Sequence, residues 1–176
     1  MSWWGKVIGG AFGFMLGGPL GALLGVALGH NFDRGMRALP DGAWGQEKLA
    51  GGEKERIQTA FFTATFAVMG HLAKADGRVT QAEIRVAEEV MRQMDLNKQM
   101  RDTAIRLFNE GKSAGFPLED VLQQFRQECH GRTTLIRMFI EIQLQAAHAD
   151  GELDPAEDRL MVRICGLLGI SEADYR

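Results

Sequence analysis

The feature that most constrains the fold is an internal duplication. Asp76-Gly77 in HLAKADGRVTQAEIRVAEEVMRQMDLN returns 74 residues later as Asp150-Gly151 in LQAAHADGELDPAEDRLMVRICGLLGIS. Further pairs match at the same offset: Val79 with Leu153, Thr80 with Asp154, Glu83 with Glu157, Val90 with Ile164, Met94 with Leu168, Leu96 with Ile170 and Asn97 with Ser171. A match that stays in register over this length indicates a duplicated structural unit, so we expect both copies to adopt one local structure.

Each copy has the pattern of a helix, a loop and a second helix. The glycine of the DG pair supplies the left-handed residue that ends the first helix. Thr80 or Asp154 then caps the second helix, and Glu83 or Glu157, three residues on, completes a capping box. Apolar residues recur at helical spacing in both second helices, as Ile84, Ala87, Val90, Met91 and Met94 and as Leu160, Met161, Ile164, Cys165 and Leu168.

The rest of this region is helical as well. We expect helices at about 98–110 and 118–129, separated by Gly115 and Pro117. The segments 60–73 and 135–147, which lead into the two DG loops, are apolar on most of their circumference and should be neighbours at the centre of a bundle. On the second of them, Arg137 and Glu141 are predicted to form a partly buried ion pair. The sequence predicts an all-α fold.

The N-terminal region has a different character. From Val7 to Gly29 there is no charged side chain, and a helix of that length would be about 35 Å long, slightly more than a hydrocarbon core of about 30 Å. A cleaved signal peptide is the alternative, but its apolar stretch would be shorter and a cleavage site should follow. We therefore predict an uncleaved transmembrane helix, with Trp3 and Trp4 at the headgroup level.

Glycine stands at every fourth position of this segment, from residue 5 to residue 29. Small residues four apart line one side of a helix and let a second membrane helix come close. Gly13, Gly17, Gly21 and Gly25 form the middle of this stripe. We expect them to mediate helix pairing, which gives a homodimer if the partner is a second copy and a hetero-complex if it is another membrane protein.

Charges flanking the span predict its orientation. Lys6 and the amino terminus precede it, whereas five basic residues follow within the next stretch: Arg34, Arg37, Lys48, Lys54 and Arg56. This places the C-terminal side in the cytoplasm, so we expect a single-pass protein of a bacterial inner membrane. The predicted organisation is a transmembrane anchor at 1–32, a Gly- and Pro-containing linker at 33–53 and a helical domain at 54–176.

Composition excludes some functions. The formal net charge is −3, and no basic block is interleaved with aromatic residues, so nucleic acid is not an expected partner. No serine or cysteine stands in a recognisable nucleophile setting, and His71, His130 and His148 have no histidine counterpart in the other copy of the repeat. We expect no enzyme. The two cysteines, Cys129 and Cys165, suit a reducing compartment as small buried side chains.

The repeats share four acidic residues, which are the candidate metal ligands: Asp76, Glu83, Asp150 and Glu157. If the two loops face each other, their oxygens could bind a hard divalent cation such as Ca²⁺. The loops are not EF-hands, because the span from Asp76 to Glu83 is seven residues where eleven are needed. Capping and turn hydrogen bonds explain the same residues without any cofactor.

Several runs carry a family resemblance: the glycine-rich span followed by GHNFDR, then FFTATFAVMGHLAKADGRVTQAEI, LIRMF.EIQLQAA and HADGELDPAE. Together they resemble the family of DjlA-type, membrane-anchored DnaJ-like co-chaperones, and the paired ADG units alone are similar to the TerB-like domain named for tellurite resistance. The resemblance covers nearly all of residues 3–176. It implies an inner-membrane anchor, a cytoplasmic TerB-like helical domain and, further along such proteins, a J-domain that stimulates the ATPase of a DnaK-type chaperone.

The sequence departs from that pattern at one place. A J-domain acts through a His-Pro-Asp turn, and no His-Pro-Asp occurs in these 176 residues. Asn97 begins a helix of more than ten residues, whereas only five residues follow its counterpart Ser171, so we expect a truncated product or fragment. Two hypotheses result: the membrane-anchored regulatory portion of a DjlA-type co-chaperone, or a stand-alone TerB-like ion-binding module acting in metal or oxyanion stress.

Overall fold

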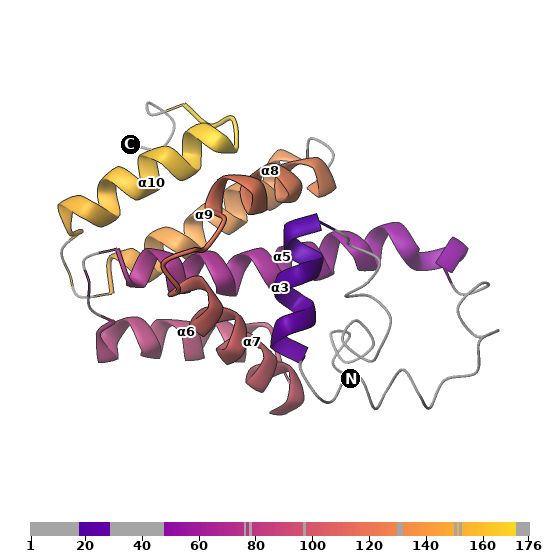
Figure 1. The fold of residues 1–176 in the computed structure, drawn as a ribbon, viewed down its shortest axis with the longest axis horizontal. Coiled ribbons are helices and arrows are strands. Elements are labelled where there is room, and N and C mark those ends of the chain that lie inside the picture. The colour runs from indigo at the N-terminus through magenta and orange to yellow at the C-terminus, as the bar shows by residue number, and fades with distance from the viewer. Residues whose placement is uncertain are drawn as a thin grey trace.

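The computed structural model describes residues 18–28, 48–75, 77, 79–96, 98–129, 132–149, 151 and 153–171. These residues form helices and no strands (Figure 1). The helices are α3 (Gly18–Leu28), α5 (Lys48–Ala73), α6 (Gln81–Gln93), α7 (Lys98–Gly111), α8 (Leu118–Cys129), α9 (Thr133–Ala147) and α10 (Pro155–Leu167). The predicted all-α fold is confirmed, and α7 and α8 lie where the sequence places them.

Helix α5 is the centre of the bundle. It contacts all six of the other helices and runs through the molecule in Figure 1. From Thr59 to Gly70 every residue is buried, which explains why this segment carries no charged side chain. Helix α9 packs directly on it, and the buried Gln143 donates from Nε2 to the Thr65 carbonyl oxygen at 2.9 Å. The predicted central pair is confirmed.

The predicted ion pair on α9 is wrong. Arg137 and Glu141 are both exposed, together with Met138. The buried face of α9 consists of other residues: Ile136, Phe139, Ile140, Gln143, Ala146 and Ala147. A helix with an apolar majority can still turn one polar stripe to water, and Arg137 and Glu141 belong to that stripe.

The closest helix packing in the bundle is the crossing of α5 and α7. A Cβ atom on Gly70 would lie 1.9 Å from the Phe108 carbonyl oxygen, and one on Gly111 would lie 1.8 Å from the Ala67 carbonyl oxygen. Neither position can hold any other residue without separating the helices. Two glycines, one on each helix, therefore allow backbone to meet backbone.

The helix, loop and second helix of the duplicated unit are confirmed in both copies, and the predicted capping box is confirmed in the first copy. Gly77 and Gly151 both have a positive φ, of 87° and 88°. Thr80 accepts from the Glu83 N–H at 3.2 Å as half of a capping box, whereas Asp154 accepts from the Ala156 N–H at 2.8 Å. The two second helices also end alike, as α6 is followed by Asp95 (φ 53°) and α10 by Gly169 (φ 78°).

Helix α3 packs against α5, α7 and α8 (Figure 1). Its buried face consists of Leu20, Leu23, Leu24 and Ala27, whereas Val26 is 61 % exposed. Both ends are held by side chains of the bundle: the Leu20 N–H donates to Gln124 Oε1 at 2.7 Å, and Arg106 Nη1 donates to the Ala27 carbonyl oxygen at 3.1 Å. These bonds satisfy main-chain groups that a helix terminus leaves unpaired.

Two N-terminal predictions are affected. Among the described residues, none of the helices is both long enough and apolar enough to cross a bilayer. Of the predicted span, α3 represents only residues 18–28, and the remainder lies outside the described part of the chain. The linker prediction needs correction at its end, because α5 begins at Lys48 and residues 48–53 are helical. The helical segment that was expected at 60–73 therefore begins earlier than predicted.

Candidate functional site

The repeat brings two of its four shared acids to one place. Glu83 and Glu157 occupy the third position of α6 and α10 and are only 2 % and 3 % exposed. Both line one narrow space between the C-terminal ends of α5 and α9. The other residues around this space are apolar: Met69, Leu72, Ala73, Ala146 and Ala147.

Two carboxylates in such surroundings need compensation. Each ion loses hydration on burial, the two negative charges repel, and the nearby helix C-termini carry partial negative charge as well. Glu83 obtains part of this compensation locally, because its Oε2 accepts from the Thr80 N–H at 3.5 Å. A bound divalent cation would also offset this charge, and carboxylate oxygens are the donors that Ca²⁺ prefers.

The donor set fits a cation in its chemistry but is incomplete. Asp76 and Asp150, the other two predicted ligands, lie outside the described residues. Within the described part of the chain, no three His, Cys, Asp or Glu side chains come together as a metal site. The space between Glu83 and Glu157 has no room for a water molecule. The pair was predictable as shared acids, but not as buried ones, because an N3 glutamate in a capping box is usually near the surface.

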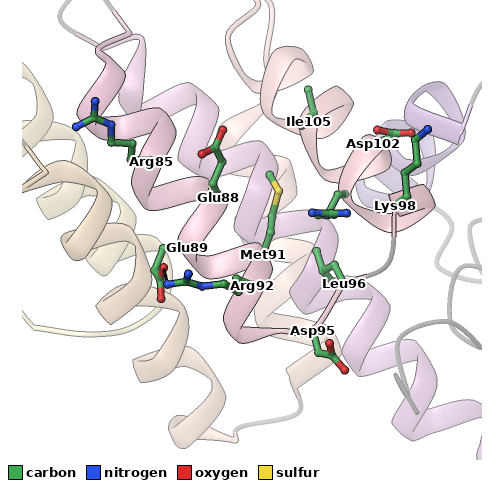
Figure 2. Close-up of a pocket in the computed structure, with 11 residues that line it drawn as sticks. Arg85, Glu88, Glu89, Met91, Arg92, Asp95, Leu96, Lys98, Asp102 and Ile105 are labelled. Carbon is green, nitrogen blue, oxygen red and sulfur yellow. Dashed lines mark hydrogen bonds and ion pairs between the residues drawn. The ribbon is translucent and has the colours of Figure 1, made fainter.

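A large hollow of the described structure lies between α6 and α7. It is an open groove of about 780 Å³. Figure 2 shows Arg85, Glu88 and Glu89 projecting from α6 and Lys98 and Asp102 from α7, with Met91 and Leu96 between the two rows. Arg92 pairs with Glu89 on the same helix. Acidic and basic side chains are equally numerous, so the groove has no dominant charge.

The potentially reactive side chains are unsuited to nucleophilic chemistry. Burial raises the pKa of the Cys129 thiol to about 11, with a further contribution from the Glu128 charge, and burial also raises the pKa of Cys165. Both thiols are therefore protonated at neutral pH. Burial lowers the pKa of His71, partly opposed by the hydrogen bond between its Nδ1 and the Gly111 carbonyl oxygen at 3.2 Å. His148 is exposed, and His130 lies outside the described residues.

The predicted dimerisation stripe is only partly described. Gly13 and Gly17 lie outside the described residues, whereas Gly21 and Gly25 belong to α3. Gly21 is half-buried and does not belong to the leucine face that packs on the bundle. Sequence analysis missed this leucine face, although its spacing of three and four residues is an ordinary amphipathic signal. Because the whole segment is apolar, no polar residues mark the opposite face of the helix, and the spacing of the leucines cannot be recognised.

Comparison with known families divides the chain into two parts. The family described as "Tellurite resistance protein TerB" matches residues 62–176. A second family, described as "Co-chaperone DjlA transmembrane domain", matches residues 1–46. The first match spans the duplicated unit and most of the bundle, and the second spans the glycine-rich segment with α3.

Individual relatives are similar along nearly the whole chain. The co-chaperone protein DjlA of Photobacterium profundum is 49 % identical over 96 % of this chain. The DjlA proteins of Yersinia pseudotuberculosis and Escherichia coli K12 are each 44 % identical over 99 % of it. The chain spans only 61 % or 62 % of the length of these relatives. No solved structure matches.

Proposed function

Since the chain belongs to the TerB family of helical domains, we propose that it is the membrane-anchoring and interaction region of a DjlA-type co-chaperone. The observation that carries the proposal is the unbroken similarity to DjlA proteins, which runs from the glycine-rich segment through the whole bundle. In this proposal the N-terminal segment holds the protein at the inner membrane, and the bundle lies in the cytoplasm.

The proposed activity is binding. The thiols are protonated, the large groove is lined by balanced charges, and the buried Glu83 accepts a hydrogen bond from the Thr80 N–H. None of these arrangements presents a nucleophile with an adjacent base. A binding partner would contact the outer surfaces of the helices.

Location and orientation can be tested in one experiment. The full chain with a C-terminal tag is expressed in bacteria, and its inner-membrane vesicles are washed with alkaline carbonate. We expect the chain to stay in the membrane pellet, and we expect protease to remove the tag from inside-out vesicles but not from intact spheroplasts. Release by carbonate, or digestion in spheroplasts, would contradict the proposal.

Partnership with a DnaK-type chaperone is a separate part of the proposal. We assign it to a His-Pro-Asp-containing J-domain, a motif that these 176 residues do not contain. The purified chain should therefore leave the ATPase rate of a DnaK-type chaperone at its basal value, while a J-domain protein added as a positive control should accelerate it. Clear acceleration by this chain alone would show that another surface performs the task.

Pairing through the glycine stripe is the proposed basis of a homodimer. A branched side chain on the stripe would hold a neighbouring backbone away. We expect Gly17→Ile with Gly21→Ile to abolish self-association in a membrane two-hybrid assay without preventing insertion. Ala22→Ile with Val26→Ile also enlarges two side chains, but on an adjacent face, and should leave association unchanged. Equal behaviour of the two double variants would reject the stripe as the interface.

An ion-binding module is the second candidate, favoured by the convergence of Glu83 and Glu157. We expect calorimetric titration of Ca²⁺ or Mg²⁺ into the full chain to show saturable binding that Glu83→Gln with Glu157→Gln removes. Glutamine retains the capping function, so this variant separates ligation from capping. Asp76→Asn with Asp150→Asn should have the same effect if the loops complete the site. No heat and no thermal shift with the unmodified chain would leave capping as the whole explanation.

A further inference from the structure

A second hollow, of about 380 Å³, lies where three elements meet. These are the C-terminal end of α5, the turn that follows α7 and the first half of α10. Its polar lining consists of His71, Lys74, Lys112, Ser113, Arg159 and Arg163. The remaining lining residues are small or apolar, so the hollow has a short apolar wall and a ring of donors.

The charge of this hollow is one-sided. Four of its lining side chains are cationic and none is acidic, in a chain whose formal net charge is −3. The α6–α7 groove provides the contrast, because its wall holds both signs in equal number. Several cations facing one concave space raise the local positive potential and concentrate anions there.

Most of this charge is not neutralised within the described structure. Arg163 forms an ion pair with Glu119, which does not line the hollow. Lys74 Nζ has only a long hydrogen bond to the Gly77 carbonyl oxygen, at 3.4 Å. Lys112 Nζ lies 5.9 Å from the centre of the Phe108 ring, and Arg159 has no ion-pair partner among the described residues.

The surroundings add donors of other kinds. Ser113 contributes a hydroxyl group. The Nδ1 atom of His71 is occupied by the Gly111 carbonyl oxygen, which leaves Nε2 as the free ring nitrogen. Because His71 is neutral at pH 7, Nε2 can accept a hydrogen bond from the O–H of a singly protonated anion.

Part of the positive charge of the hollow comes from a difference between the two copies of the repeat. Arg159 has the counterpart Arg85, but Arg163 stands where the first copy has Glu89. In the first copy Glu89 pairs with Arg92, so that face of α6 is internally neutral. The exchange of Glu for Arg makes the same face of α10 cationic. Core packing does not require this change, because Arg163 is exposed and Glu89 is only half-buried.

We propose that this hollow binds a small phosphate-bearing anion. Arginine offers paired N–H groups that match two phosphate oxygens, and lysine offers a mobile point charge, so Lys74, Lys112 and Arg159 can surround a dianion. The volume lies in the range of small-ligand pockets. A free phosphate compound and a phospholipid headgroup share this chemistry. The proposal does not depend on the co-chaperone assignment.

The test uses the full chain in a zwitterionic detergent and pyrophosphate as the probe. We expect calorimetry at low ionic strength to show one saturable site per chain. Lys74→Gln with Arg159→Gln should weaken it at least tenfold. The matched control is Arg85→Gln with Lys98→Gln, which removes one arginine and one lysine, both exposed, from the α6–α7 groove. This control should leave affinity within about twofold.

A third variant separates shape from charge. Ala114 is exposed and lines the hollow, so Ala114→Phe should obstruct it while keeping every cation. We expect this variant to lose pyrophosphate binding and to keep the melting temperature of the parent chain. Equal weakening by both charge variants would indicate general screening, and it would overturn the proposal, as would unaffected binding in Ala114→Phe or no binding at all.

The source of the phosphate is distinguished by two further titrations. Short-chain phosphatidic acid, added as dilute monomers, tests a lipid headgroup, and ATP tests a soluble phosphate compound. Preference for the lipid that Lys74→Gln with Arg159→Gln abolishes would assign the hollow to a headgroup, and preference for ATP would assign it to a soluble ligand. Either result supports the proposal, whereas binding of both probes that is insensitive to the variants refutes it.

Discussion

Two groups of glycines in this protein concern close helix contact, and they differ in their spacing. The stripe at residues 13, 17, 21 and 25 is regular and conspicuous, and sequence reasoning assigns it to close helix contact. Gly70 and Gly111 stand alone, 41 residues apart, and nothing in their neighbourhoods marks them. Yet the described structure places its closest helix crossing at these two residues, whereas α3 packs on the bundle through leucines beside the stripe.

The difference shows that a periodic sequence pattern predicts which residues share one face of a helix, but not what packs against that face. A stripe of glycines indicates that one side of a helix lacks side chains, and it does not identify the element that contacts this side. The meeting of Gly70 with Phe108 and of Gly111 with Ala67 is a property of two helices together. The sequence pattern of one helix therefore cannot predict this crossing.

The largest effect should come from filling the α5–α7 crossing. In Gly111→Ala the new Cβ would lie 1.8 Å from the Ala67 carbonyl oxygen, and rigid helix backbone cannot yield as a side chain can. We expect a loss of about 3 kcal/mol or more in the free energy of unfolding, measured by urea denaturation. Gly70→Ala should behave similarly.

Gly166→Ala is the control for that prediction. This glycine lies on the exposed side of α10, and nothing would lie within 4 Å of its added Cβ. Alanine is the better helix former, so we expect a gain of about 0.5–1 kcal/mol. If Gly111→Ala were tolerated as well as Gly166→Ala, the close crossing would not exist in solution.

The crossing should also be sensitive to pH through His71. Burial lowers the pKa of His71, so the unfolded chain takes up its proton at a higher pH than the folded protein does. The stability that His71 provides is complete above about pH 6.5, the ordinary value, and is lost as the pH falls through the lowered folded pKa. The melting temperature should therefore decrease between pH 7 and pH 5.

His71→Asn sharpens this prediction. The asparagine amide can replace Nδ1–H as the donor to the Gly111 carbonyl oxygen, but it does not titrate. We expect the variant to lose part of the decrease in melting temperature below pH 6.5. An unchanged slope would mean that acidic side chains, and not His71, dominate the pH dependence.

The smallest expected effect concerns Asp95, which stands in the first copy of the repeat where the second copy has a glycine. Asp95 has a φ of 53° at the position where the second copy of the repeat has Gly169, and the following Leu96 N–H donates to the Met91 carbonyl oxygen at 3.2 Å. Left-handed backbone is costly for most residues and is less so for aspartate. Asp95→Gly should raise the free energy of unfolding by about 0.5 kcal/mol. Destabilisation would show that the Asp95 side chain contributes more than its backbone strain costs.

Much of the bundle could be predicted because its signals are local. The DG glycines, the Thr80 cap and the helical spacing of apolar residues each depend on neighbours within a few positions. The exposure of Arg137 and Glu141 could not be predicted in this way, since it depends on which side of α9 faces α5. The burial of Glu83 and Glu157 had the same origin, because each is an ordinary capping residue until the two copies come together.

The hollow lined by Lys74, Lys112 and Arg159 could not be predicted from the sequence for a similar reason. Lys74, Lys112 and Arg159 come from three elements and are separated by up to 85 residues. The slightly negative net charge of the chain gives no indication that these cations lie together. Within the repeat, the replacement of Glu89 by Arg163 is the sequence signal of this charge.

The leucine face of α3 has a thermodynamic consequence. A side chain can be withdrawn from water only once, so Leu20, Leu23 and Leu24 cannot gain from a bilayer and from the bundle at the same time. Burial in protein is worth about 1.5–3 kcal/mol for each leucine, while insertion of a leucine at the centre of a membrane helix contributes about 0.3–0.6 kcal/mol. The bundle thus competes with the bilayer for this segment. The free energy that α3 gains by packing on the bundle has to be given up before α3 can insert into a membrane.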